Sequence, residues 1–376
     1  MALTRLNNNS LLQTTAGDNF RNIIINGDMS IAQRGTSFTG LGNGDNATYT
    51  LDRFAFNESG APTGECTFSQ NTDVPTGQGF AKSLKVDITT AQTTMAAGDL
   101  LYTSTMFEGQ NLQYLKYGTS SADKLTLSFW VKSNVTTGNF AISLYNQDPS
   151  TTRIVNLTYS INVADTWEKK TFTIDGDTAS GNGFDNDNNR SLWVNWIFSS
   201  GVDWTSGTQS SSWQDYATTK WGAGHTANLF SSTSNYINIT GVQLEAGTTA
   251  SDFEFLPYDV NMQRCERYYQ VLYYIQSSVI TTGNSATTSV ALAPINYKPL
   301  RVAPSVTLPP ASKSNGAAFL TSNAGSVTSV GTHTVANISV NNFIINASGY
   351  TGLTDDGVSL YYVYGSPQVI TLDAEL

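Results

Sequence analysis

The segment Leu125-Thr126-Leu127-Ser128-Phe129-Trp130-Val131 decides the fold class of this chain. Every second residue from Leu125 to Val131 is apolar, so one face of an extended strand is apolar while Trp130 lies on the other face. The same period recurs in residues 49–56, 83–88, 140–145, 154–161, 167–174, 191–198 and 236–244. Short alternating strands without intervening helices predict an all-β antiparallel sandwich or barrel.

An apolar triplet, Ile23-Ile24-Ile25, precedes these strands and ends at Asn26-Gly27-Asp28. Because Asn-Gly is a strong turn signal, we expect a strand followed by a tight turn. Strand periodicity fades in residues 199–232, where Gly, Ser and Thr are frequent. That stretch is predicted to be a long functional loop or a pair of loops.

A second β-region follows a break in the pattern at Pro257. Asp259 is placed to cap a short helix that ends near Arg267. Strands are predicted in residues 268–275, 343–345, 360–364 and 369–372. No repeat of fixed period occurs, which argues against a β-helix.

The length of 376 residues suits two or three domains, each with its own core. We predict an N-terminal attachment arm (1–20), a sandwich domain (21–258), and a connecting helix with a smaller C-terminal β-sandwich domain (259–376). The polar arm is predicted to order against a partner; a frayed terminus is the alternative.

Charged residues make up only 13% of the chain, and the net charge is −10. Nucleic acids and anionic membranes need a basic patch, so neither is an expected partner. The first residues do not resemble a signal peptide, and no segment is long and apolar enough for membrane insertion. Cys66 and Cys265 lie far apart, which predicts two buried, reduced thiols in a protein made in a reducing cytoplasm.

Three sets of short motifs lie along the chain. They are NIIINGDM (22–29) with QRG (33–35) and YTLDRF (49–54); GVQLEAG (241–247) with ASDFE (250–254) and CERYY (265–269); and the terminal DAEL (373–376). In their order and spacing they resemble bacteriophage tail-fibre and related virion proteins. In those proteins Trp is more usual after the Asp-Arg pair, where this chain has Phe54.

The resemblance implies a jelly roll like that of carbohydrate-binding modules, then a connecting helix and a small C-terminal β-domain. It also implies a place on the surface of a phage virion, assembly as a homotrimer, and synthesis in the host bacterial cytoplasm. The N-terminal arm would then attach the protein to other virion proteins.

The matched residues themselves suggest structural roles. Asp52 and Arg53 are placed to form a partly buried pair. Val242 and Leu244 are expected to face the core, with Gln243 pointing outward.

Tryptophan is concentrated between residues 193 and 221. Trp193 and Trp196 fall in a predicted strand and are expected to fill the core. The irregular stretch beyond them is a candidate glycan site, because exposed rings stack on sugars and nearby polar groups supply hydrogen bonds. The alternative is that these rings pack down a long loop or fill a subunit interface. The candidate residues are Trp204, Trp213, Tyr216 and Trp221, with Asp203, Gln209, Gln214 and Asp215.

Two acidic stretches, 175–177 and 185–189, invite a structural calcium ion, the one cofactor considered. A helix-loop-helix calcium loop starting at Asp185 fails, because its sixth position is Arg190 and its twelfth is Trp196. An irregular calcium-binding loop or a solvated turn remain as alternatives. No other metal is expected, since His225 and His333, the only histidines, lack ligand spacing.

Catalysis is not expected, because the sequence has neither a Gly-x-Ser-x-Gly elbow nor a phosphate-binding loop, and no carboxylate pair stands out. Our first hypothesis is therefore a non-enzymatic tail fibre or other adhesion component that recognises a host surface glycan. The second is a purely structural virion component, such as a head fibre, decoration protein or tail adaptor. The third is a glycan-degrading enzyme.

Overall fold

The computed structural model describes residues 20–44, 47–321, 330–353 and 355–376. The predicted N-terminal arm, residues 1–20, therefore lies outside the described residues apart from Phe20. The chain divides into two compact units: the first ends at Asn261 and also contains Leu376, and the second runs from Met262 to Glu375.

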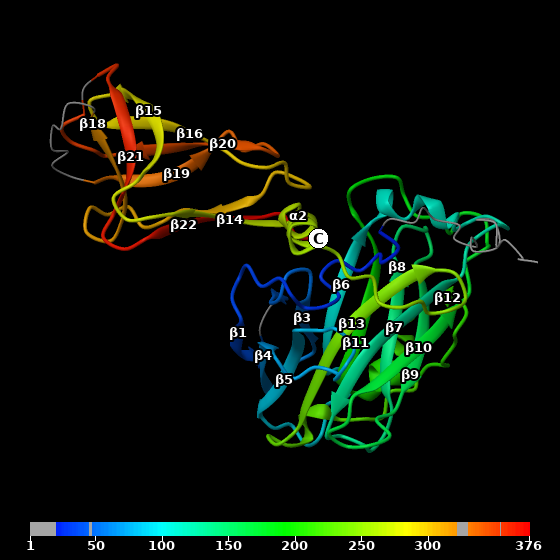
Figure 1. Cartoon of the computed structure of the whole chain (residues 1–376). Helices are drawn as coiled ribbons and strands as arrows, with labels where there is room; N and C mark the ends of the chain where they lie inside the picture. Colours follow the sequence, from blue (N-terminus) through cyan, green and yellow to red (C-terminus); the bar gives the residue numbers. More distant parts are fainter. Residues whose placement is uncertain (1–19, 45–46, 322–329, 354) are drawn as a thin grey trace, which may run out of the picture. The chain divides into compact units, whose positions relative to one another are not determined.

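The first unit is an antiparallel sandwich of two sheets, drawn from blue to green in Figure 1. The six-stranded sheet has the order β1 (Ser37–Gly42), β4 (Glu65–Asn71), β5 (Ser83–Thr90), β13 (Tyr236–Ala246), β7 (Leu125–Ser133) and β10 (Glu168–Ile174). The seven-stranded sheet has the order β12 (Gln214–Asp215), β9 (Arg153–Tyr159), β8 (Phe140–Asn146), β11 (Arg190–Ser200), β6 (Leu100–Glu108), β3 (Ala55–Ser59) and β2 (Thr48–Tyr49). The predicted antiparallel jelly-roll sandwich is confirmed.

In the described residues, the connections between these strands contain five short helical turns. They are η2 (Gly109–Asn111), η3 (Gln113–Leu115), α1 (Val202–Thr205), η4 (Thr218–Lys220) and η5 (Leu229–Ser231). No helix in the described part of the chain is both long enough and apolar enough to cross a membrane.

The core of this unit lies between the two sheets and follows from strand alternation. On β7, Leu127, Phe129 and Val131 are fully buried in it. On β11, Leu192 and Trp196 enter the same core from the facing sheet. Burial of this apolar surface is the main stabilising contribution to a sandwich of this size. Cys66 and Cys265 are both buried, as predicted.

Residues 49–56 were predicted as one strand, and this prediction is wrong. The chain turns between β2 and β3, where Arg53 takes a positive φ of 69°. The Phe54 amide donates to the Leu51 carbonyl at 2.9 Å, which closes the turn. Leu51 broke the alternation in the sequence, and that break marks the turn.

The predicted pairing of the two residues in this turn is also wrong. Asp52 and Arg53 are each only 1% exposed. The Asp52 carboxylate accepts hydrogen bonds from the backbone and side chain of Gln33, at 2.7 and 2.6 Å. Arg53 instead donates to the Met106 carbonyl at 2.6 Å. The two matched stretches 33–35 and 49–54 therefore bind each other.

The Ile23-Ile24-Ile25 triplet is irregular rather than the predicted strand. It nevertheless lies along β13, because the Ile23 amide donates to the Leu244 carbonyl at 2.8 Å. The side chain of Asn22 takes the place of further backbone pairing. Its Oδ1 accepts from the Leu244 amide at 3.0 Å, and its Nδ2 donates to the Val242 carbonyl at 3.0 Å.

Gly27 continues the contact between residues 22–27 and β13. Its carbonyl accepts a hydrogen bond from the Val242 amide at 2.9 Å. A Cβ at this position would lie 2.0 Å from the Val242 carbonyl oxygen. Only glycine allows the two backbones to approach so closely. The close approach to Val242 therefore explains why the turn at Asn26-Gly27-Asp28 has glycine at its centre.

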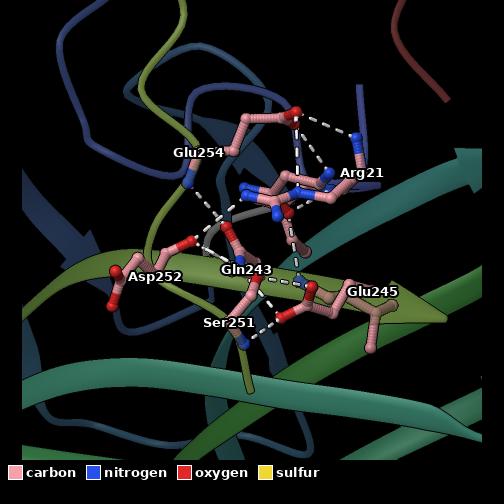
Figure 2. Close-up of polar contacts among 9 residues, drawn as sticks. Arg21, Gln243, Glu245, Ser251, Asp252 and Glu254 are labelled. Atoms are coloured by element: carbon pink, nitrogen blue, oxygen red, sulfur yellow. Dashed lines mark hydrogen bonds and ion pairs between the residues drawn. The ribbon is translucent and has the colours of Figure 1, made fainter. Parts of the chain in front are cut away.

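A network of polar side chains, which we call the terminal clasp, joins both ends of the sandwich domain (Figure 2). Its centre is Gln243, which is completely buried although it lies on the opposite face from Val242 and Leu244. The prediction that Gln243 points away from the core is right, but residues 251–254 cover it. The clasp comprises Arg21, Asn22, Gln243, Glu245, Ser251, Asp252 and Glu254.

Hydrogen bonds within the clasp connect the start of the domain with β13 and with residues 251–254. Glu254 accepts hydrogen bonds from the Arg21 and Asn22 amides, at 3.1 and 2.9 Å. The Glu254 amide donates to Gln243 Oε1 at 2.8 Å. Glu245 accepts from the amide and hydroxyl of Ser251, at 2.9 and 2.7 Å. The residues behind the family resemblance are therefore structural: they tie the start of the domain to its last strand.

Helix α2 (Tyr258–Glu266) follows, close to its predicted position. The second unit then holds two sheets, so the smaller C-terminal β-region is confirmed. One sheet has the order β14 (Tyr269–Tyr274), β22 (Gln368–Asp373) and β17 (Ser305–Thr307). The other has the order β18 (Gly316–Thr321), β21 (Val358–Tyr364), β15 (Val279–Thr287), β16 (Val290–Asn296), β20 (Asn342–Ser348) and β19 (Thr332–Ala336).

Candidate functional site

The outer face of the seven-stranded sheet, opposite the core, carries most of the tryptophan-rich region. Alternation along β11 sends Trp196 into the core and Trp193 to this outer face. The prediction for Trp196 is confirmed, but the prediction that Trp193 fills the core is wrong. Trp193 is half-buried and faces Tyr145 of β8 across the sheet.

Six rings, which we call the aromatic cluster, gather on this outer face. Trp221 lies at their centre, with 6% of its surface exposed. Its ring centroid lies 5.0 to 6.5 Å from those of the other five rings, mostly in edge-to-face contact. Such pairs stabilise beyond the burial of their area. The cluster comprises Tyr102, Tyr145, Trp193, Trp204, Tyr216 and Trp221.

The segment 201–228 supplies half of these rings by folding back over the sheet. The Trp204 indole N–H donates to the Gly98 carbonyl at 2.8 Å. The Tyr216 amide donates to the Thr152 carbonyl at 2.8 Å. Asn156 of β9 donates through its side-chain amide to the Trp221 carbonyl at 3.2 Å. The predicted long loop is thus a packed cover held by hydrogen bonds to the sheet.

Burial corrects the predicted glycan site. Trp213 and Trp221 are only 9% and 6% exposed, so their faces are closed to a sugar in this conformation. Trp213 also lies apart from the aromatic cluster, against Tyr117 in the main core. The structure brings together Trp204, Tyr216 and Trp221. For Trp213 and Trp221, the alternative prediction of packing down a long loop describes the geometry.

Three of the four predicted polar side chains also have partners within the fold. Gln209 and Gln214 each donate a hydrogen bond to a side chain of β9, at 3.1 and 3.3 Å. Asp215 forms an ion pair with Arg153. Asp203 is exposed at the start of α1. Gln209, Gln214 and Asp215 thus hold the cover in place.

Of the rings that reach solvent, sequence reasoning identified Trp204 and Tyr216 as candidates but missed Tyr145 and Trp193. Tyr145, Trp193 and Tyr216 are all half-buried, and we call them the ring trio. Tyr145 is central, with centroid distances of 5.7 Å to Trp193 and 5.2 Å to Tyr216. The phase of alternation on β8, where Phe140 and Leu144 are core residues, assigns Tyr145 to the outer face. That signal was present in the sequence.

The hydroxyl groups near the trio stay protonated at neutral pH. Burial raises the pKa of Tyr102 to about 12 and also raises the pKa of Tyr145. Their O–H groups can therefore donate hydrogen bonds. A sugar has apolar C–H faces and polar hydroxyl groups. Surface aromatic rings that carry O–H or N–H groups at their edges suit both features.

The first acidic stretch considered for calcium, residues 175–177, is engaged by cationic side chains. The buried carboxylate of Asp177 accepts from Arg153 Nε at 2.8 Å and from Asn182 at 2.9 Å. Asp175 pairs with Lys124 at 2.7 Å. Among the described residues, no group of three His, Cys, Asp or Glu side chains could hold a metal ion. A calcium ion at these stretches stays a prediction.

A shallow groove of about 670 Å³ lies in the second unit. It is lined by residues 306–309, Ala311 and residues 331–335. His333 is its one titratable side chain, and burial lowers the pKa of that imidazole to about 4. Hydrogen bonds to Tyr350 and Tyr361, at 2.6 and 3.1 Å, fix the ring. The imidazole is therefore neutral and structural at physiological pH.

His225 makes the first unit sensitive to acid. It is a buried residue of the cover itself, and its Nδ1 accepts from the Ala141 amide of the sheet at 3.1 Å. Burial lowers the pKa of His225 from 6.5 to about 4. Folding therefore excludes a proton that the unfolded chain binds below pH 6.5. The stabilisation is complete above pH 6.5 and is lost as the pH falls to 4, by up to about 3 kcal/mol.

Chemical unfolding of the wild type and of His225→Gln at pH 7, 5 and 4 measures this effect. We expect the free energy of unfolding of the wild type to fall more steeply with acid, because the variant lacks the titrating group. Carboxylates contribute equally to both proteins, so the difference isolates His225. Parallel pH dependences would contradict the assignment.

Comparison with known proteins gives distant structural similarity alone. No protein-family model and no curated protein matches this chain. The enzymatically active domain of tailspike protein 4 from bacteriophage CBA120 is similar over 61% of this chain, with a TM-score of 0.32 and 13% identity; the match spans 22% of that chain. A family 11 carbohydrate-binding module from Clostridium thermocellum is similar over 56% of this chain and 95% of its own, with a TM-score of 0.27 and 10% identity. A family 30 carbohydrate-binding module is similar over 64% and 93%, with a TM-score of 0.28 and 11% identity. The likeness concerns the β-sandwich architecture.

Proposed function

We propose that this chain is a non-enzymatic surface protein of a bacteriophage virion, a tail fibre or other adhesion component that contacts a glycan on the host. The ring trio on the outer face of the seven-stranded sheet carries the proposal for glycan contact. The sequence stretches that form the terminal clasp carry the proposal for a virion protein. The protein would be made in the host cytoplasm and then carried on the particle.

The mechanism we propose is avidity. Three half-buried rings offer a small contact, and a single small contact binds weakly. Assembly as a homotrimer, with several copies on each particle, would convert weak sites into firm attachment. The polar segment before residue 21 would join the protein to other virion proteins.

A purely structural role is the second candidate. The burial of Trp213 and Trp221 favours it, because these rings stabilise a cover rather than meet a ligand. Locating the chain in a map of the intact virion separates the two, since an adhesion component lies at a host-facing tip and a decoration protein or adaptor does not.

Removing the ring trio tests the adhesion role. We expect Tyr145→Ala/Trp193→Ala/Tyr216→Ala to weaken adherence of the purified protein to host cells at least tenfold, about 1.4 kcal/mol or more. Stacking on each lost ring supplies that energy. The measurement is the adherence of fluorescently labelled protein to host cells across a concentration series.

The matched control is Trp167→Ala. Trp167 is also half-buried, but it lies beside β10 of the other sheet, where its indole N–H donates a hydrogen bond to Asp73 at 3.0 Å. It should adhere like the wild type. Circular dichroism establishes that the triple variant is folded. Full adherence by a folded triple variant would remove the ring trio as the contact. Release of reducing sugars from host polysaccharide would contradict the non-enzymatic assignment.

A further inference from the structure

Arg190 lies at the edge of the ring trio, at the first position of β11. Its guanidinium carbon is 3.9 Å from the centroid of the Trp193 ring, a close cation–π contact. Regular alternation would place Arg190 on the same face as Leu192, towards the core. A register shift between Arg190 and Leu192 in the pairing of β11 with β6 prevents this. Such bulges re-aim a side chain, and this one delivers a positive charge to the outer face.

Arg190 also differs from other basic groups of the first unit. Arg153, Lys124 and Lys132 each hold a carboxylate within 2.8 Å. Within the described ranges, no carboxylate lies within ion-pair distance of Arg190; its side chain reaches the Met106 sulfur at 3.9 Å and the Trp193 ring. In a chain with 29 acidic and 19 basic residues, an arginine without an acidic partner is unexpected.

The surroundings leave this charge poorly compensated. The titratable groups that face it are the phenols of Tyr49, Tyr102 and Tyr145, and none of these is a carboxylate. The Arg190 Nε atom is buried and has no hydrogen-bond partner among the described residues. Burial lowers the pKa of the guanidinium, so its charged form is less favoured here than in water. An anion bound beside Arg190 would stabilise the charged guanidinium and offset the hydration that burial removes.

We infer that the ring trio and Arg190 form one site for an acidic sugar, in which Arg190 binds the carboxylate and the rings pack against the sugar ring. A planar guanidinium matches a carboxylate through two parallel hydrogen bonds. This inference rests on the proposed glycan contact and specifies its ligand: a uronic-acid type of sugar rather than a neutral one.

Tryptophan labelled with ¹⁵N gives a direct readout in the full chain, which has seven indole N–H groups. The Trp193 signal is assigned by its absence in Trp193→Phe. The probes are D-glucuronate, D-glucose and acetate, each titrated to about 10 mM, roughly ten times the Kd of a weak single-sugar site. We expect glucuronate to shift the Trp193 signal. The affinity for glucose and for acetate, measured from the same signal, should be at least about tenfold weaker.

Variants at position 190 identify the group that reads the charge. Arg190→Gln should weaken glucuronate binding at least about tenfold, and Arg190→Lys should restore part of it, because lysine keeps the charge without the planar fork. Lys85→Gln is the matched control: it removes a cation that lies 5.2 Å from the Tyr236 ring on the other sheet. It should bind glucuronate like the wild type.

Each outcome decides a separate claim. Equal shifts with glucose and glucuronate, or an unchanged affinity in Arg190→Gln, overturn the preference for acidic sugars but leave the glycan contact intact. A shift with acetate as strong as with glucuronate means that the site binds free anions and overturns the role of the sugar ring. No shift with any probe overturns the acidic-sugar site, whereas the adherence of the ring-trio variant decides the adhesion role independently.

Discussion

Replacing Gly27 with alanine is expected to lower the free energy of unfolding of the first unit by more than about 4 kcal/mol, among the largest effects of single substitutions. The new Cβ would lie 2.0 Å from the Val242 carbonyl oxygen and 3.1 Å from its carbonyl carbon. Neither backbone can easily withdraw. The Val242 amide is bonded to the Gly27 carbonyl, and its carbonyl is bonded to Asn22.

Urea unfolding followed by tryptophan fluorescence measures this effect in the first unit, because all seven tryptophans lie between residues 130 and 221. Gly98→Ala is the control. The nearest atom to its new Cβ is Asp203 Oδ2, at an ordinary 3.8 Å, so we expect a change below about 1 kcal/mol. If Gly27→Ala unfolds at the same urea concentration as Gly98→Ala, the close approach of the two backbones is wrong.

The strands that alternate cleanly could be predicted from sequence, because one face of each meets the core and the other meets water. Residues 83–88 and 125–131 correspond to β5 and β7, whose inward residues are buried between the sheets. The same reasoning failed for β6, which was not predicted. All nine of its residues are buried, since the core covers one face and the aromatic cluster with its neighbours covers the other. A strand covered on both faces loses its alternation.

The terminal clasp shows a second limit of sequence reasoning. Alternation places Gln243 opposite Val242 and Leu244, and this holds. Alternation cannot reveal that residues 251–254 return to cover the glutamine, because that return is set by hydrogen bonds between segments far apart in sequence. A polar residue predicted to meet solvent is buried as soon as such partners satisfy it.

The candidate site could be predicted only in part, for a related reason. Composition located the tryptophan-rich stretch correctly, but it could not distinguish Trp221, which the cover buries against the sheet, from Trp193, which reaches the surface. Counting along β11 assigns Trp193 to the outer face once Trp196 is known to enter the core. Arg190 escapes even that count, because the bulge before Leu192 reverses its side. Because of this bulge, the sequence pattern could not assign Arg190 to the outer face, where the acidic-sugar site needs it.

Trp221→Ala is expected to lower the free energy of unfolding by about 3–5 kcal/mol, the usual range for a buried tryptophan. The indole contacts the other five rings of the aromatic cluster, and none of them can move in to fill its volume without losing its own hydrogen bonds or strand pairing. Trp221→Phe keeps part of the volume and should cost less than half as much. Urea unfolding followed by circular dichroism measures both, since the substitution removes a fluorophore.

The same variant tests whether Trp221 anchors the cover. Lys220 immediately precedes it, and its side chain donates to the Asp215 carbonyl at 2.7 Å. If the indole holds the segment 201–228 on the sheet, its loss raises the population in which the segment opens locally. We expect trypsin to cut after Lys220 at least about tenfold faster in Trp221→Ala than in the wild type, because cleavage follows the open population. Trp167→Ala, altered elsewhere, should leave this rate unchanged. An equal rate in Trp221→Ala would mean that the hydrogen bonds to β9 hold the cover without the indole, and that Trp221 is available for another role.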